Sequence, residues 1–322
     1  MRSRILLSIA ALLMAFATAP AHAQQYPSRP ISIVVPFAAG GGSDLLARLV
    51  AQKLEEKLGK PVIVENRPGA ATTLAAMQVV RAAPDGYTLM QATSSTMAIN
   101  VSMSKKMAYE PLKDLVPVAL LSSSPFFLVV NKDLPVTSVA ELIALAKSKP
   151  GELRYASGGN GSAAHLAMEY FKLQTGIDLI HVPYRGTAPA VTDVLAGQVE
   201  LIMTGIPAVQ QPVKAGKLRA LGVSTRAPLA SMPGVPAIAA TIPDFEAIQW
   251  YGIVAPAGTP AEIVQRLNAE INRALMSPAL KSRLEAEGAE AAPITPAAFG
   301  ALIDSEIKRW KPVVERSGMK PD

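Results

Sequence analysis

The sequence predicts an α/β protein built as two lobes, each a mostly parallel sheet flanked by helices. β-like and helix-like segments alternate along the chain, which is the pattern of parallel sheets covered by helices. Two glycine-rich loops, at residues 36–44 and 156–165, each follow a short β-like run and open an amphipathic helix. Because this construction occurs twice, about 120 residues apart, we expect two lobes that each offer unpaired helix N–H groups to one shared anion.

The first part of the chain contains a β-α-β-α-β series. Apolar residues recur every three or four positions after Ser43, which predicts a helix capped by Ser43 and ended by Gly59. The other expected elements are a strand at 31–36, a strand at 62–64, a helix at 70–81 and a strand at 87–91. Two short β-like runs follow, separated by the polar stretch 122–125.

A second series starts at Ser138, which forms a capping box with Glu141. Its expected elements are helices at 162–175 and 189–196 and strands at 153–156, 180–182, 199–203 and 218–224. A strand at 248–255 and three helices finish the chain. Since a chain that leaves a lobe and completes it later must cross twice, we expect hinge segments near 121–127 and within 225–250. The expected division is lobe 1 at 24–124 plus 229–322, discontinuous, and lobe 2 at 125–228.

The start of the chain predicts a secretory signal peptide. A basic start at Arg2 and Arg4 precedes an apolar run at 5–19 and the small-x-small sequence Ala21-His22-Ala23, so we expect cleavage after Ala23. The apolar run is shorter than the roughly 20 residues that a membrane span needs. The chain has no cysteine, so no lipid-carrying cysteine could anchor it. These features predict an exported periplasmic protein without a direct membrane anchor.

Charge and composition argue against nucleic acid as a partner. The formal net charge is +6, and loss of Arg2 and Arg4 with the signal peptide lowers it to +4 (6 − 2). The remaining Lys and Arg residues are spread singly and alternate with Glu, and aromatic residues make up only 5% of the chain. A nucleic-acid surface would need a clustered basic stripe.

Enzyme and cofactor motifs are incomplete. Residues 159–164 fit the dinucleotide pattern G-x-G-x-x-A, but the next strand, at 180–184, lacks the acidic residue that holds a ribose. No G-K-[ST] phosphate loop and no metal-ligand spacing occurs, so we expect no cofactor, no metal and no catalytic residue. His165 is interpreted as a polar lid or hydrogen-bond donor at the mouth of the second loop. A secreted α/β hydrolase that uses Ser43 or Ser162 stays open as an alternative.

Small polar residues follow the predicted strands, where ligands bind in open parallel sheets. Asp44 stands at a helix start, and either the helix dipole alone explains it or it accepts hydrogen bonds from a ligand or fixes the loop. Arg185 is the only cation near a predicted site, and it either clamps a second carboxylate through two hydrogen bonds or only lies on the rim of the site. The full candidate binding set is Phe37, Ala38, Gly40, Gly41, Gly42, Ser43, Asp44, Thr72, Thr73, Thr93, Ser94, Ser95, Gly159, Asn160, Gly161, Ser162, Ala163, His165, Tyr184, Arg185, Gly186 and Thr204.

Several short sequence motifs along the chain form a recognisable set. They are IVVPF at 33–37, GGGSD at 40–44, VENRPGA at 64–70, APDGYTL at 83–89, the glycine-rich run at 159–165, VPYRG at 182–186, GQV at 197–199 and WYG at 250–252. Together they resemble the Bug-type receptors, the extracytoplasmic solute-binding proteins of tripartite tricarboxylate transporters. The resemblance implies a Venus-flytrap fold of the type II periplasmic binding class that closes on a small carboxylate. It also implies that main-chain amides and ordered waters of the loop at 37–44 and of the Thr72-Thr73 turn hold the ligand, and that residues 159–165 and 184–186 close over it.

Two positions depart from the family pattern. Ala71-Thr72-Thr73 replace glycines, and Thr204-Gly205 stand where the family often has an Asp, which favours dicarboxylates or aromatic acids over amino acids. The resulting hypothesis is a monomeric periplasmic receptor that captures a dicarboxylate, tricarboxylate or aromatic acid. It would deliver this ligand to the membrane permease subunits of a tripartite tricarboxylate-type transporter. A ligand-binding sensor partner of a signalling system is a further alternative.

Overall fold

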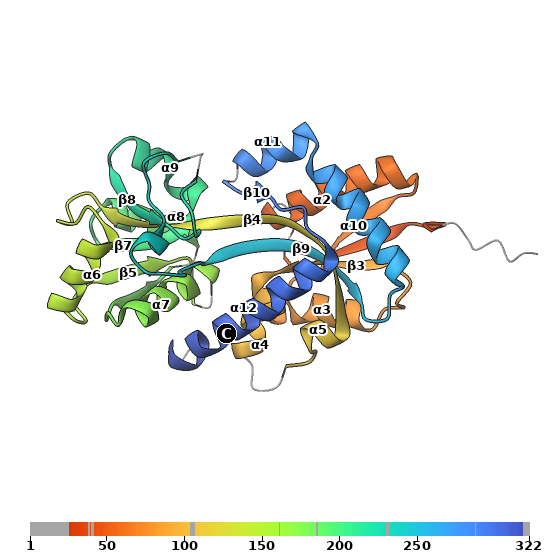
Figure 1. Cartoon of the computed structure of the whole chain (residues 1–322), viewed down its shortest axis with the longest axis horizontal. Helices are drawn as coiled ribbons and strands as arrows, with labels where there is room; N and C mark the ends of the chain where they lie inside the picture. Colours follow the sequence, from red (N-terminus) through yellow and green to blue (C-terminus); the bar gives the residue numbers. More distant parts are fainter. Residues whose placement is uncertain are drawn as a thin grey trace, which may run out of the picture.

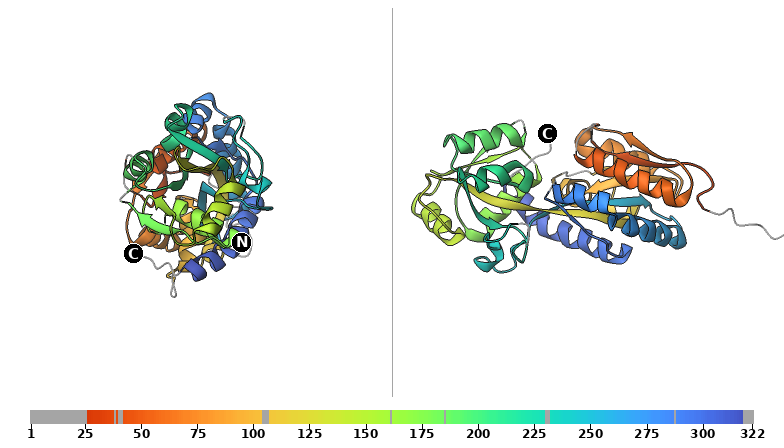
Figure 2. Two further views of the ribbon diagram at one scale, coloured as in Figure 1. Left: turned by 90° about the vertical axis from the view of Figure 1, so that its left-hand side faces the viewer. Right: turned by 90° about the horizontal axis from the view of Figure 1, so that it is seen from above.

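The computed structural model describes residues 26–37, 39, 42–103, 107–160, 162–184, 186–229, 232–286 and 288–317. Two lobes lie side by side along the long axis of the molecule, joined by the long strands β4 (Leu115–Asn131) and β9 (Ile248–Pro256), as Figure 1 and the view from above in Figure 2 show. The two-lobed α/β architecture predicted from the sequence is confirmed. The expected signal peptide at 1–23 lies outside the described residues.

Three parallel strands in the order β2-β1-β3 form the outer part of the first lobe. The bounds are β1 (Ile31–Val35), α2 (Gly42–Leu58), β2 (Val62–Asn66), η1 (Ala70–Thr72), α3 (Thr73–Val80), β3 (Thr88–Thr93), η2 (Ser95–Ile99), α4 (Asn100–Met103) and α5 (Pro111–Asp114). The apolar stripe of α2 contributes Leu46, Val50 and Leu54, which are buried against the β-branched strand β1. This series matches the predicted one, with Gly59 in the left-handed region directly after α2.

The second lobe repeats the parallel arrangement in the order β7-β5-β6. Its elements are α6 (Val139–Ser148), β5 (Arg154–Ser157), α7 (Ala163–Thr175), β6 (Ile180–Pro183), α8 (Thr187–Leu195), β7 (Leu201–Gly205), α9 (Ile206–Lys214), β8 (Leu218–Val223) and η3 (Ile238–Ala240). Ser138 caps α6 by accepting the N–H of Glu141, as the capping box predicts. No helix was predicted at α9, where Pro212 lies inside the helix and weakens the local helical signal.

One continuous strand, β4, replaces the two short β-like runs that were predicted. Its first part pairs with β9 as far as Pro125, and its last part, from Phe126 on, lies between β7 and β8. The polar stretch 122–125 predicts a break from local sequence alone, but pairing with β9 on one side and β10 (Glu290–Ala291) on the other keeps the strand extended. Antiparallel β4 and β9 thus join the parallel parts of the two lobes into one mixed sheet.

The C-terminal helices complete the first lobe and reach the second. They are α10 (Ala261–Leu275), α11 (Pro278–Ala286) and α12 (Pro296–Ser317). The first half of α12 buries Phe299 in a first-lobe cluster, whereas Trp310 in its second half is buried with Phe245 in the main second-lobe cluster (Figure 1). Ile242 belongs to that second-lobe cluster too, so we propose that the return crossing is made by β9, after Ala247. None of the helices in the described part of the chain is both long and apolar enough to span a bilayer.

Candidate functional site

A cavity of about 240 Å³ lies between the two lobes, at the carboxyl ends of the parallel strands. The first lobe contributes Phe37, Thr93 and Ser95, and the crossing strands contribute Phe126 and Gln249. The second lobe contributes Gly158, Ser162, Ala163, Ala164, Thr187, Thr204 and Gly205. Six of these twelve residues carry a side-chain hydroxyl or amide, and two carry phenyl rings, whereas none of the twelve is charged. The cavity therefore offers hydrogen bonds and apolar contact, without a basic side chain among the described residues that line it.

Three helix N-termini of the second lobe converge on this cavity. α7, α8 and α9 each start directly after one of the parallel neighbours β5, β6 and β7, so their first turns meet at one edge of the sheet. Ser162 caps α7 by accepting the N–H of His165 at 3.2 Å. α8 and α9 begin after Gly186 and Gly205 and have no side-chain cap. Their unpaired N–H groups and the three helix dipoles favour an anion at this position.

On the first-lobe side, Ser43 is held by the central strand β3. Its hydroxyl donates to Oε1 of the fully buried Gln91, and the Gln91 amide donates back to the Ser43 carbonyl at 3.0 Å. Ser43 lies inside α2, which includes Gly42, so the expectation that its side chain caps this helix is wrong. The Ser43 hydroxyl reaches Gln91 because the start of α2 lies close to β3, the strand that carries this buried amide side chain.

Asp44 ties the start of α2 to β2. Its carboxylate, only 2% exposed as a residue, accepts hydrogen bonds from Asn66 Nδ2 at 2.9 Å and Arg48 Nε at 3.0 Å. Asn66 also donates to the carbonyl of Phe37, which lines the cavity. Asp44 itself is not among the lining residues, so its observed contacts fit a loop-fixing role.

The threonines and serines after β2 and β3 divide into two groups. Thr93 and Ser95 line the cavity, and the Thr93 hydroxyl also accepts the N–H of Thr96 at 3.2 Å, which shapes the start of η2. Ser94 is buried, and its hydroxyl has no hydrogen-bond partner among the described residues. Thr72, at φ +73°, and Thr73 are not lining residues, and the Thr72 hydroxyl accepts from Asn100 at 3.2 Å.

Only some of the remaining second-lobe candidates line the cavity. Thr204 and Ala163 line it, and Gly186 is the residue that precedes α8. The Tyr184 hydroxyl donates to Asp193 of α8 at 2.7 Å. Gly159 takes a φ of +134°, next to Asn160. Five candidates, Ala38, Gly40, Gly41, Gly161 and Arg185, lie outside the described residues.

His165 is buried and is not among the described residues that line the cavity. It is 3% exposed, and its ring stacks on His181 with centroids 3.8 Å apart. Burial, with a smaller contribution from His181, lowers the pKa of His165 to about 4, and burial also lowers the pKa of His181. The hydrolase alternative finds no support here, because the Ser43 hydroxyl bonds Gln91 and the Ser162 hydroxyl accepts a backbone N–H. Within the described ranges, no group of three or more His, Asp or Glu side chains could hold a metal ion.

Six lining residues are absent from the candidate set predicted from the sequence: Phe126, Gly158, Ala164, Thr187, Gly205 and Gln249. Gly205 had a usable signal, since a glycine followed by proline at the second helical position is typical of a helix start. Phe126 and Gln249 had none, because they reach the site only through the pairing of the crossing strands β4 and β9.

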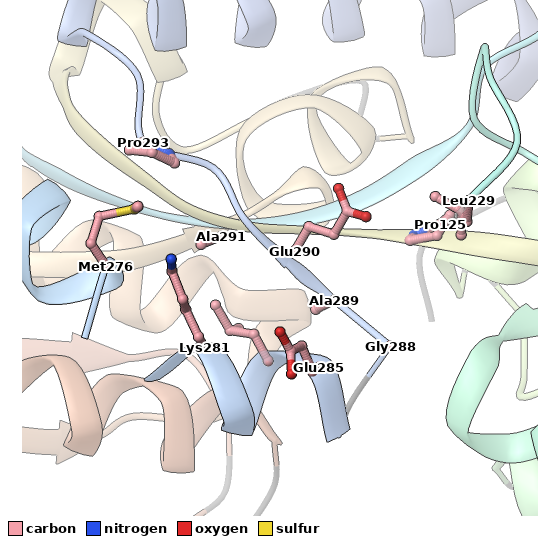
Figure 3. Close-up of a pocket in the computed structure, with 11 residues that line it drawn as sticks. Pro125, Leu229, Met276, Lys281, Glu285, Gly288, Ala289, Glu290, Ala291 and Pro293 are labelled. Atoms are coloured by element: carbon pink, nitrogen blue, oxygen red, sulfur yellow. The ribbon is translucent and has the colours of Figure 1, made fainter. Parts of the chain in front are cut away.

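A second, larger groove of about 610 Å³ lies on the side of α11 and β10 (Figure 3). Lys281, Glu285 and Glu290 line it together with apolar residues, and Leu229 of the second lobe reaches it from the other side. None of the sequence-predicted site residues is among the described residues that line this groove. Because both positive and negative side chains line this groove, it has no electrostatic preference for an anion.

Comparison with known proteins shows the family of this chain. Residues 46–319 match the family described as "Tripartite tricarboxylate transporter family receptor". The chain belongs to this family. Protein BugT of Bordetella pertussis is 39% identical over 319 residues, which cover 98% of each chain. The resemblance to Bug-type receptors drawn from the motifs is therefore confirmed.

Solved structures of similar proteins agree with this assignment. Rpa4515 of R. palustris, solved with adipate, is 38% identical, has a TM-score of 0.75 and matches over 92% of this chain and 100% of its own. MatC (Rpa3494) of Rhodopseudomonas palustris, solved with bound malate, is 35% identical, has a TM-score of 0.72 and matches over 90% and 100%. Both of those proteins hold a small dicarboxylate, and both share the receptor fold seen here.

Proposed function

We propose that this receptor captures a small organic carboxylate between its two lobes and delivers it to the membrane permease subunits of a tripartite tricarboxylate-type transporter. The observation that carries the proposal is the convergence of α7, α8 and α9 on the interlobe cavity. Three helix N-termini and the surrounding hydroxyls can bind a carboxylate through charge-assisted hydrogen bonds, each of which contributes roughly 1.5–3 kcal/mol. The phenyl rings of Phe37 and Phe126 supply apolar contact for a carbon chain.

Other observations support parts of this function. The adipate and malate in the two similar structures are dicarboxylates of a size that suits a cavity of about 240 Å³. The signal-peptide pattern supports export to the periplasm. We further propose that the receptor is a monomer without a cofactor and without catalytic activity.

A ligand screen on the chain that starts at residue 24 tests the proposal. Thermal unfolding is followed with adipate, malate, citrate and benzoate, and with adipamide as an uncharged control. At least one acid should raise the melting temperature in a concentration-dependent way, whereas adipamide should not. If no acid shifts the unfolding of a properly folded chain, the proposal is wrong.

A matched pair of variants tests the place of binding. Thr204→Val keeps a β-branched side chain in β7 and removes a hydroxyl from the cavity, so the dissociation constant of the acid should rise about tenfold. Thr192→Val, on the exposed side of α8, is the control and should leave the constant unchanged. Equal constants for both variants would place the ligand elsewhere.

Delivery to a transporter is tested in cells. Deletion of the gene should abolish uptake of the acid that binds in vitro, and the wild-type gene should restore it. Intact uptake with a lost transcriptional response would instead favour the sensor alternative.

A further inference from the structure

A stack of three rings lies in the second lobe, close to residues that line the interlobe cavity. Tyr155 of β5 stacks on His181 of β6 with centroids 4.8 Å apart, and His181 stacks on His165 of α7 at 3.8 Å. The chain has three histidines, and His22 falls in the expected signal peptide. The mature chain would therefore keep only this pair.

His181 is connected to the turn that follows β5. Its Nε2 lies 2.7 Å from the hydroxyl of Ser157, which is 1% exposed. The same hydroxyl accepts the N–H of Gly159 at 3.2 Å and donates to the Gly159 carbonyl at 3.1 Å. Since a hydroxyl has a single proton, this pattern requires the tautomer of His181 that donates from Nε2. His181 thus fixes the Gly158–Gly159 backbone through one serine.

That backbone is part of the binding cavity. Gly158 lines it, and the Gly158 carbonyl accepts the N–H of Gly186, the residue before α8, at 3.1 Å. The other imidazole, His165, belongs to the first turn of α7, whose start is capped by Ser162. The two stacked rings therefore join the turn after β5 and the first turn of α7, both of which face the cavity.

We propose that His181, acting through Ser157 and stacked on His165, is a positioning residue for the anion-binding turn, and that protonation of the stack weakens ligand binding. The inference rests on the proposed function and names a pH-dependent control of the same site. No part of it requires His181 to touch the ligand.

Burial, rather than the surrounding charges, keeps the stack neutral. The groups that face the two rings are Tyr155 on β5 and Glu169 and Lys172 on α7. Glu169 accepts from the Tyr155 hydroxyl at 2.5 Å and pairs with Lys172 at 2.9 Å, so its charge is already matched. The Glu169 carboxylate still favours a proton on either ring and the Lys172 ammonium opposes it, so burial is the main reason that both rings stay neutral. Acid should therefore separate the rings and release Ser157 only as the pH falls toward the lowered pKa values of the two rings, about 4 for His165.

Calorimetric titration with adipate between about pH 7.5 and about pH 4 tests the positioning role and the effect of acid. Ser157→Ala and His181→Phe should each raise the dissociation constant about fivefold at the upper pH, the loss of one hydrogen bond. His181→Gln can still donate to Ser157 and should recover most of this loss. In the His181→Gln variant, the affinity for adipate should change with pH only because adipate itself takes up protons. In the wild type, the affinity should fall more than this as the pH is lowered. Tyr170→Phe, on the same helix as His165, is the matched control and should behave like the wild type. Identical curves for the wild type and His181→Phe would overturn the proposal.

A measurement without ligand separates this inference from the proposed function. Nuclear magnetic resonance of the ligand-free chain reports the two imidazoles and the Gly159 amide separately. The Gly159 amide should shift with the same titration midpoint as His181 and should stop doing so in His181→Gln. If it does not follow His181, the positioning role is wrong whatever the chain binds. If it follows but no acid binds at any pH, the proposed function fails instead.

Discussion

Asp44 shows at the residue scale how a buried charge can serve a site without facing it. Its carboxylate accepts from Asn66 and Arg48, and Asn66 holds the carbonyl of Phe37. Asp44→Ala leaves the half-buried Asn66 amide with fewer partners, so the free energy of unfolding should fall by about 1–3 kcal/mol, and carboxylate affinity should fall with it. Urea denaturation and calorimetry measure the two effects.

Arg48→Ala is the control for Asp44. The Arg48 side chain is 48% exposed, so its ion pair with Asp44 should contribute no more than about 0.5 kcal/mol to the free energy of unfolding. Lost affinity with full stability in Asp44→Ala would instead show that the carboxylate contacts the ligand, the other hypothesis that the sequence left open.

The stacked histidines make stability depend on pH. Burial lowers the pKa of His165 to about 4, so the folded state binds protons less readily than the unfolded chain. The stabilisation is present above about pH 6.5 and is lost as the pH falls to about 4, by on the order of 3 kcal/mol. The double variant His165→Phe/His181→Phe should lose less stability over this interval. Parallel curves of unfolding free energy against pH for the two proteins would contradict the assignment.

At the scale of elements, the start of α8 depends on a close approach of backbone. A Cβ on Gly158 would lie 3.2 Å from the Thr187 hydroxyl and 3.4 Å from the Thr187 nitrogen. Gly158→Ala should therefore push α8 away from the cavity and weaken carboxylate binding by about tenfold, which corresponds to about 1.4 kcal/mol. Calorimetry with the acid found in the screen measures this loss.

Gly300→Ala is a suitable control for Gly158→Ala. A Cβ there would meet Pro117 at 3.5 Å, an ordinary contact, and alanine favours the helical conformation of α12 by up to about 1 kcal/mol. Unchanged affinity is expected for Gly300→Ala. The same unchanged affinity for Gly158→Ala would mean that α8 does not take part in binding.

At the scale of the whole molecule, binding between lobes should protect both of them. We expect a bound acid to slow amide hydrogen exchange together at the start of η2 in the first lobe and at the starts of α7, α8 and α9 in the second. Amides of α11, beside the larger groove of Figure 3, should keep their rates and serve as the internal control. Protection of one lobe alone, or of α11, would contradict capture between the lobes.

The sequence by itself determined the elements whose signals are local. The apolar stripe of α2, the capping box of Ser138 and Glu141 and the alternation of strands and helices depend on neighbours within a few residues, and they predicted two lobes correctly. The glycine loops likewise indicated a helix N-terminus as the anion site. Family motifs then narrowed this chemistry to a carboxylate receptor.

Only the tertiary structure decided what depends on contacts between distant segments. β4 stays one strand because β9 and β10 pair with it across the polar stretch that predicted a break. Ser43 lies inside α2 rather than at its cap, and its hydroxyl donates to Gln91, 48 residues away. Phe126 and Gln249 meet the starts of α7, α8 and α9 in one cavity only because the crossing strands bring them there. Local patterns specify helices and strands, whereas a binding site is made by their convergence, which no short stretch of sequence records.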